Sequence, residues 1–93
     1  MNEKEVIVLN DDEIVQLYFE RSEESIAQSE EKYGRLCRSV IRRILPDERD
    51  AEECLSDVWI HTWNSIPPEK PRVLSAFLAR IARNLALDRL SYN

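Results

Sequence analysis

The stretch YGRLCRSVIRRILP, residues 33–46, has the clearest periodicity in the chain. Its apolar residues recur at intervals of three and four, which places them on one face of a helix. They are Tyr33, Leu36, Cys37, Val40, Ile41, Ile44 and Leu45. Arg35, Arg38 and Arg42 fall on a different face at similar spacing. Pro46 ends the helix because it has no amide hydrogen to donate and its ring clashes with the carbonyl of the preceding turn. The stretch therefore predicts an amphipathic helix with a buried stripe and a basic face.

The residues after Pro46 predict two further helices. Asp47 is suited to cap the segment ERDAEECLSDVWIHTW, residues 48–63. The stripe expected to be buried there comprises Ala51, Cys54, Leu55, Val58, Trp59, Thr62 and Trp63, and the opposite face carries Glu53, Ser56, Asp57 and Ile60. Three prolines make the segment NSIPPEKP, residues 64–71, a stiff connector that cannot be helical. The last helix is expected to begin near Pro71. Its buried stripe is predicted to be Leu74, Phe77, Leu78, Ile81, Leu85 and Leu90.

The N-terminal third is expected to begin with a flexible lead, residues 1–10. A domain of residues 11–93 follows it. Asn10 or Asp11 can cap a first helix that runs through DEIVQLYFER, residues 12–21. Ser22 is a second capping candidate. A second helix that simply continues the first with a kink stays an alternative, because no residue in between is a strong helix breaker.

Length and composition favour one small all-α domain, a compact bundle of three to four helices. The 93 residues include a single glycine, which disfavours a β-rich fold because tight turns depend on glycine. Cys37 and Cys54 are expected to be reduced core residues rather than a disulfide. A zinc site from Cys54, Asp57 and His61 is a weak alternative, since zinc motifs have tighter, repeated spacing. No apolar run is long enough to cross a membrane and no signal peptide is evident, so a cytoplasmic location is expected.

Charge is arranged in alternating blocks along the chain, whose net charge is −5. Residues 1–31 hold ten acidic and two basic residues, and residues 32–45 hold five basic residues and no acidic ones. Residues 46–64 are again acidic and residues 65–93 are basic. This pattern is typical of a domain with two electrostatically different faces.

The sequence contains no catalytic constellation: it has one histidine, no glycine-rich phosphate loop and no nucleophile beside a base. We therefore expect no enzyme and no cofactor. Arg80, Arg83, Asn84 and Leu87 line one face of the last helix, with residue types that contact phosphates and base edges. A merely solvated basic face is the alternative. Trp59 and Trp63 could stack on bases, but their helical spacing favours core packing.

Two segments resemble region two of a bacterial RNA polymerase sigma factor. They are DERDAEECLSDVWIHTWNSI, residues 47–66, and AFLARIARNLALDRL, residues 76–90. The likeness is to the sigma-70 superfamily, and within it to the small extracytoplasmic-function type, and it covers roughly residues 11–91. The second motif is the more specific, because Ile81-Ala82-Arg83-Asn84 is followed by Asp88 at the family's spacing.

The resemblance implies two partners, core RNA polymerase and promoter DNA. In the family, an acidic helix binds a coiled coil of the largest polymerase subunit. The positions that this implies here are Glu53, Ser56, Asp57 and Ile60, where Ser56 replaces the usual glutamine. The next helix and the loop before it recognise and melt the minus-ten element as a single strand. The implied DNA-binding residues are Arg72, Arg80, Arg83, Asn84 and Leu87, and the implied base-capture loop comprises Asn64, Ser65 and Ile66.

The resemblance also implies what lies beyond this domain. The family's C-terminal helix-turn-helix is not found in the sequence, so we expect the chain to be the N-terminal domain of a longer protein. A protein-interaction module of the same fold, serving as the target of an anti-sigma factor or as an inactive paralogue, is the alternative function. Self-association of an isolated domain is a further expectation.

Overall fold

The computed structural model describes residues 8–92, so the predicted lead falls mostly on residues 1–7, which lie outside the described part. The described chain folds into four helices: α1 (Asp11–Phe19), α2 (Glu24–Ile44), α3 (Glu48–Ser65) and α4 (Leu74–Tyr92). No strand occurs within residues 8–92. The all-α prediction is therefore confirmed.

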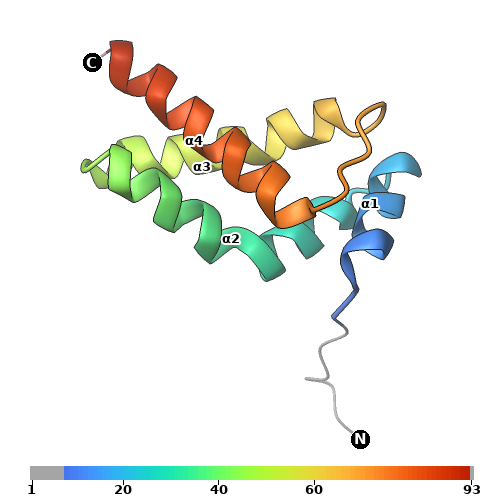
Figure 1. The fold of residues 1–93 in the computed structure, drawn as a ribbon. Helices are drawn as coiled ribbons and strands as arrows, with labels where there is room; N and C mark the ends of the chain where they lie inside the picture. The colour runs from blue at the N-terminus through green and yellow to red at the C-terminus, as the bar shows by residue number, and fades with distance from the viewer. Residues whose placement is uncertain (1–7, 93) are drawn as a thin grey trace, which may run out of the picture.

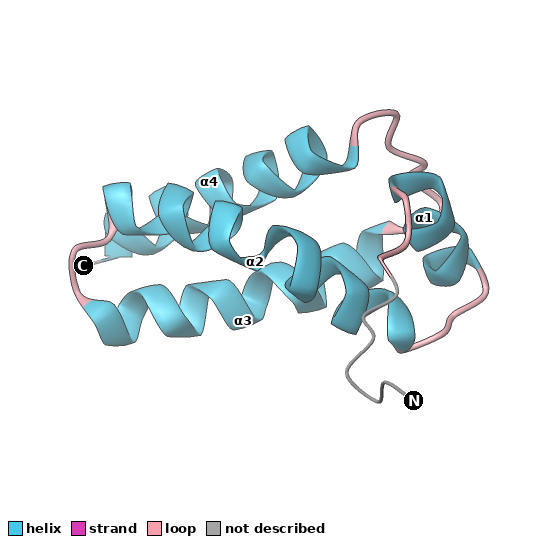
Figure 2. Cartoon of the chain, turned by 90° about the horizontal axis from the view of Figure 1, so that it is seen from below, coloured by secondary structure: helices cyan, strands magenta, loops and turns pink. Residues whose placement is uncertain are grey.

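Helices α2, α3 and α4 pack against one another in all three pairings, and α1 packs against α2 (Figure 1). Helix α3 runs back along α2, and α4 returns across both of them. Helix α1 lies at the end of the bundle where α2 begins and α3 ends, as Figure 2 shows from below. The connector between α3 and α4 is at this same end.

The core lies where the predicted stripes of the helices meet. Cys37 and Ile41 of α2 contribute to it, as do Val58 of α3 and Leu78 of α4, all of them fully buried. Two of the predicted core positions are wrong: Leu36 is 38% exposed and Leu90 is 47% exposed. Ala82 and Ala86 are buried on α4 instead. Small side chains at these positions let α4 approach its neighbours closely. Because a helix has 3.6 residues per turn, the buried face of α4 has turned away from position 90 by the end of the helix.

The helix ends follow the predicted caps in two cases. The Asn10 side chain accepts from the amide of Glu13, whose carboxylate accepts in return from the amide of Asn10, so α1 begins with a capping box. The Asp47 side chain accepts from the amide of Asp50 at the start of α3. The predicted start of the last helix near Pro71 is wrong, because α4 begins at Leu74.

The alternative of a continuous first and second helix is wrong, because the chain breaks at Arg21. This residue has a φ of 57°, in the left-handed region, which no helix can continue. Helix α2 begins at Glu24, and Glu23 before it already has helical φ and ψ and makes no side-chain capping bond. The hydroxyl of Ser22 accepts from the amide of Glu24 at 3.3 Å, which is the bond expected of the predicted capping residue.

A buried chain of hydroxyl groups fastens α1 to α2. The Ser29 hydroxyl donates to the carbonyl of Ser25 at 2.9 Å, which leaves the Tyr18 hydroxyl to donate to Ser29 Oγ at 2.7 Å. All three side chains are fully buried. Burial raises the pKa of the Tyr18 hydroxyl, so this group stays a neutral donor. The first helix is thus fixed by a specific polar link as well as by apolar packing.

Cys37 and Cys54 are both buried and unbridged, as the sequence indicates. Burial raises the pKa of the Cys37 thiol to about 11 and also raises the pKa of Cys54. Within residues 8–92, no cluster of histidine, cysteine, aspartate and glutamate side chains is arranged to hold a metal ion. None of the helices described is long and apolar enough to cross a membrane.

Candidate functional site

The outer face of α3 is an acidic surface, formed by the four residues implied as polymerase contacts. Glu53, Ser56, Asp57 and Ile60 are all exposed, as helical spacing opposite the buried stripe requires. The Glu53 and Asp57 side chains are each 56% exposed, and Ile60 is 60% exposed. The structure therefore places the exposed aliphatic side chain of Ile60 on the same face of α3 as the accessible carboxylates of Glu53 and Asp57.

Arg89 of α4 lies along the inner edge of this acidic surface. Its guanidinium donates to Glu53 Oε1, and its Nε and Nη1 lie 3.8 Å from carboxylate oxygens of Asp50 and Asp57. Sequence reasoning left the role of Arg89 open. A signal was available, because Arg89 follows Leu85 by four residues and Ala82 by seven, which places it on the stripe of α4 that faces the core. The acidic surface is thus ordered by a cation from the neighbouring helix.

The arginines on the basic face of α4 differ from Arg89 in the last turn in how they are paired. Arg80, Arg83, Asn84 and Leu87 are exposed, as the sequence predicts. Arg80 lies over the Phe77 ring, with its Cζ 6.0 Å from the ring centroid. Within the described residues, neither Arg80 nor Arg83 forms an ion pair. Their charges are therefore available to an external anion, while that of Arg89 is satisfied inside the protein.

An open hollow of about 410 Å³ lies where the connector enters α4. It is lined by Pro71, Arg72, Val73, Ala76, Phe77 and Arg80. It combines an aromatic ring and aliphatic groups with two guanidinium groups. A flat heterocycle attached to a phosphate matches that combination, because the ring can pack on apolar groups while arginine pairs with the phosphate.

The three residues implied as a base-capture loop do not form a loop. Asn64 and Ser65 belong to the last turn of α3, so the expectation of a non-helical segment from residue 64 is wrong. Ile66 is fully buried and serves as an anchor in the core. The non-helical connector comprises residues 66–73, and the peptide bonds Ile66–Pro67 and Pro67–Pro68 are cis. Helix α3 continues to Ser65 because a proline restricts only the residue directly before it. That residue is Ile66, whose backbone is extended.

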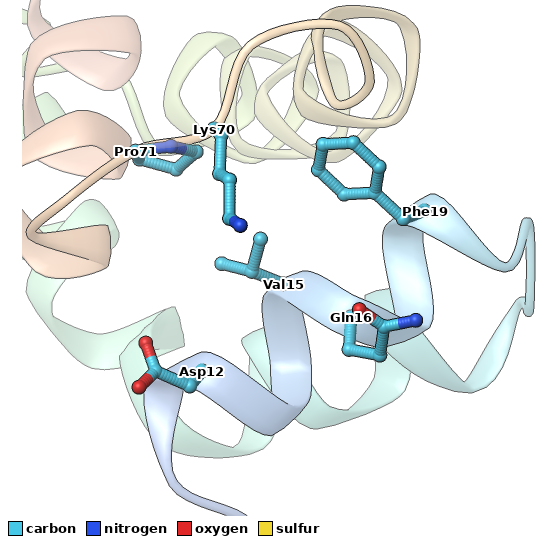
Figure 3. A pocket seen from close by; sticks show the side chains of 6 residues that line it. All are labelled: Asp12, Val15, Gln16, Phe19, Lys70 and Pro71. Carbon is cyan, nitrogen blue, oxygen red and sulfur yellow. The ribbon is translucent and has the colours of Figure 1, made fainter.

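A second hollow, of about 350 Å³, separates α1 from the connector (Figure 3). Asp12, Val15, Gln16 and Phe19 line it from α1, and Lys70 and Pro71 line it from the connector. In Figure 3 the Lys70 side chain extends toward α1, between Phe19 and Asp12. Sequence reasoning missed this feature, because α1 and the connector are about fifty residues apart in the chain and only the fold brings them together.

The acidic surface lies on α3, whereas the basic face of α4 and the hollow at the start of that helix share Arg80. No curated protein and no solved structure matches this chain. The sequence profile of sigma-70 region 2 matches residues 31–93, which include α3, the connector, α4 and most of α2. This match covers about two thirds of the chain and includes both faces. We conclude that the chain belongs to the sigma-70 region 2 family.

Proposed function

We propose that this protein binds core RNA polymerase through the acidic surface of α3 and holds single-stranded promoter DNA on the basic face of α4. Sigma-70 region 2 is, in general, the part of a sigma factor concerned with polymerase binding and promoter recognition, and it is a non-enzymatic domain. The observation that carries the proposal is the unequal use of the arginines of α4: Arg80 and Arg83 are exposed and form no ion pair within residues 8–92, whereas Arg89 is bound to α3.

The polymerase contact rests on charge and exposure. Glu53 and Asp57 can each accept hydrogen bonds from a basic partner while Arg89 holds their inner side, since a carboxylate offers about four acceptor sites. Ile60 supplies an apolar contact at the end of the same face. We assign the partner surface to the basic side of the coiled coil in the largest polymerase subunit. The whole assembly would act in the cytoplasm.

The DNA contact rests on the exposed arginines of α4 and on the hollow beside them. Arg72 and Arg80 line the hollow, and Arg83 and Asn84 lie one turn further along α4. A chain with a net charge of −5 attracts DNA poorly by itself, because nonspecific affinity comes from phosphate neutralisation. Strand capture by this face therefore depends on polymerase to present the DNA. We propose the minus-ten element as the strand.

The double variant Arg83→Ala, Asn84→Ala tests the DNA assignment. It should bind core polymerase like the unmodified chain, because these side chains belong to α4 and the acidic surface belongs to α3. It should lose at least about tenfold in the retention of a DNA bubble by the polymerase complex, since each direct contact contributes roughly 1–3 kcal/mol. Ser75→Ala, a half-buried position on the same helix, is the matched control.

The same experiment separates the alternative function. A protein-interaction module, such as the target of an anti-sigma factor, would tolerate the loss of Arg83 and Asn84 without any change in DNA retention. Polymerase binding together with unchanged DNA retention in the double variant would contradict our assignment of α4.

A further inference from the structure

The turn between α1 and α2 contains a residue in a conformation that its side chain disfavours. The amide of Arg21 donates to the carbonyl of Tyr18 at 3.0 Å, and the amide of Ser22 donates to that of Leu17 at 2.9 Å. This paired pattern is a Schellman motif, whose left-handed position is usually filled by glycine. Arg21 occupies it with a φ of 57°. An arginine there is disfavoured, because its Cβ crowds the backbone.

The Arg21 side chain makes contacts that glycine could not. Its Nη1 donates to the carbonyl of Trp63 at 3.0 Å and to that of Ile66 at 2.8 Å. Its guanidinium lies over the Trp63 ring, with Cζ 3.7 Å from the ring centroid. The carbonyls at a helix C-terminus lack intrahelical partners and carry partial negative charge. Arg21 therefore caps the end of α3 from a turn more than forty residues earlier in the sequence.

The capped end is also the start of the connector to α4. Ile66 is fully buried, and its amide donates to the carbonyl of Thr62 at 3.0 Å. The amide of Glu69 donates to the carbonyl of Ser65 at 2.9 Å. Two residues beyond Glu69, the chain reaches Pro71 at the edge of both hollows. Only four residues, two of them prolines, thus separate the buried Ile66 from the residues that line the hollow at α4.

We propose that Arg21 is a positioning residue for DNA capture: it fixes the connector, and thereby Arg72 and the hollow that begins at Pro71, without contacting DNA itself. This inference rests on the DNA role proposed for α4. Trp63 completes the arrangement, because its ring is in contact with the Arg21 guanidinium and lies near Tyr18, with the Tyr18 ring centroid 6.3 Å away. The left-handed turn of α1, the end of α3 and the entrance to α4 then act as one unit.

Arg21→Gly is the decisive variant, because glycine suits the backbone of this turn and removes only the side chain. Arg21→Lys keeps the charge but lacks the planar fork that lies on the indole and reaches two carbonyls. Hydrogen exchange at the amides of Ile66 and Glu69, which donate to carbonyls of α3, measures the connector directly. Retention of duplexes with a central bubble of random sequence, on complexes with core polymerase from the source organism, measures DNA capture.

We expect Arg21→Gly to melt within a few degrees of the unmodified chain and to bind polymerase unchanged. Exchange at the amides of Ile66 and Glu69 should accelerate about tenfold, as local opening becomes easier, and bubble retention should fall about fivefold or more through lost preorganisation. In both amide exchange and bubble retention, Arg21→Lys should fall between the unmodified chain and Arg21→Gly. Unchanged exchange in Arg21→Gly would overturn the proposal.

Two further outcomes would also overturn it. Full bubble retention by Arg21→Lys despite accelerated exchange would show a direct charge contact with DNA. Full retention by Arg21→Gly, with loss in the Arg83→Ala, Asn84→Ala variant, would remove Arg21 from DNA capture and leave the proposed function intact. If the double variant also retains the bubble, the proposed function itself fails.

Discussion

The guanidinium of Arg89, near the end of α4, is paired with the carboxylate of Glu53 on α3. This pair joins the helix proposed to hold DNA to the surface proposed to bind polymerase. It also explains how three acidic residues can share one face of α3, since Arg89 lies within 3.8 Å of Asp50 and Asp57 as well. Without a central cation, neighbouring carboxylates on a helix repel one another.

Arg89→Ala should lower the free energy of unfolding by about 0.5–1 kcal/mol at low ionic strength, because the pairs are partly solvated. The loss should shrink in 1 M salt, where the Debye length is about 3 Å. Urea unfolding at both salt concentrations measures the effect. Arg83→Ala is the matched control, since Arg83 forms no ion pair within residues 8–92, and it should change stability little. A loss that is independent of salt would contradict this account of Arg89.

The link between Tyr18 and Ser29 predicts an asymmetric pair of substitutions. Ser29→Ala leaves the fully buried Tyr18 hydroxyl without a partner and should cost about 1–3 kcal/mol. Tyr18→Phe removes the hydroxyl itself, while Ser29 keeps its bond to the Ser25 carbonyl, so it should cost only about 0.5–1.5 kcal/mol. Urea unfolding of both variants ranks the two costs. The reverse order would show that the hydroxyl chain does not fix α1 to α2.

Gly34 is the only glycine of the chain and lies inside α2. A Cβ at this position would meet nothing within 4 Å. Gly34→Ala should therefore raise the free energy of unfolding by about 0.5–1 kcal/mol through helix propensity. Ala27→Gly, an exposed position on the same helix, should lower it by a similar amount. Destabilisation by Gly34→Ala would contradict the open space around this position in the structure.

The thiol of Cys37 predicts a loss of stability in alkali. Its folded pKa of about 11 lies above the unfolded value of about 8.5. The neutral thiol therefore contributes fully below pH 8.5, and the contribution declines as the pH rises toward 11. Between pH 8 and pH 10 the unmodified chain should lose about 1–2 kcal/mol more than Cys37→Ala. Parallel pH profiles of the urea midpoint for the two proteins would contradict the assignment.

Sequence periodicity predicted the helices because each buried stripe is a local property of its own segment. The stripe of α3 was placed well, as was that of α2 apart from the exposed Leu36. Residue type alone identified Asp47 as a cap and Asn10 as one of two candidates. The prediction that Leu90 is buried was wrong, because the neighbouring helices decide which residues of a helix are covered. They no longer cover Leu90 in the last turn of α4.

The parts that sequence could not supply are contacts between distant segments. Arg21 has an unfavourable backbone conformation, and its side chain binds the carbonyls of Trp63 and Ile66, more than forty residues away. Arg89 is similar, since only the packing of α4 on α3 shows which arginine is engaged internally. The candidate DNA residues were found from residue type, but the hollow beside them depends on Pro71 and Phe77 meeting across a turn.

Co-purification with core RNA polymerase tests the central claim most directly. Asp57→Arg reverses a charge on the acidic surface, and Glu20→Arg makes the same change at an exposed position after α1. We predict that Asp57→Arg loses polymerase binding at least about tenfold, because a like charge now faces a basic partner. Glu20→Arg should bind as the unmodified chain does. Equal binding by all three proteins would contradict the assignment of α3 as the polymerase-binding surface.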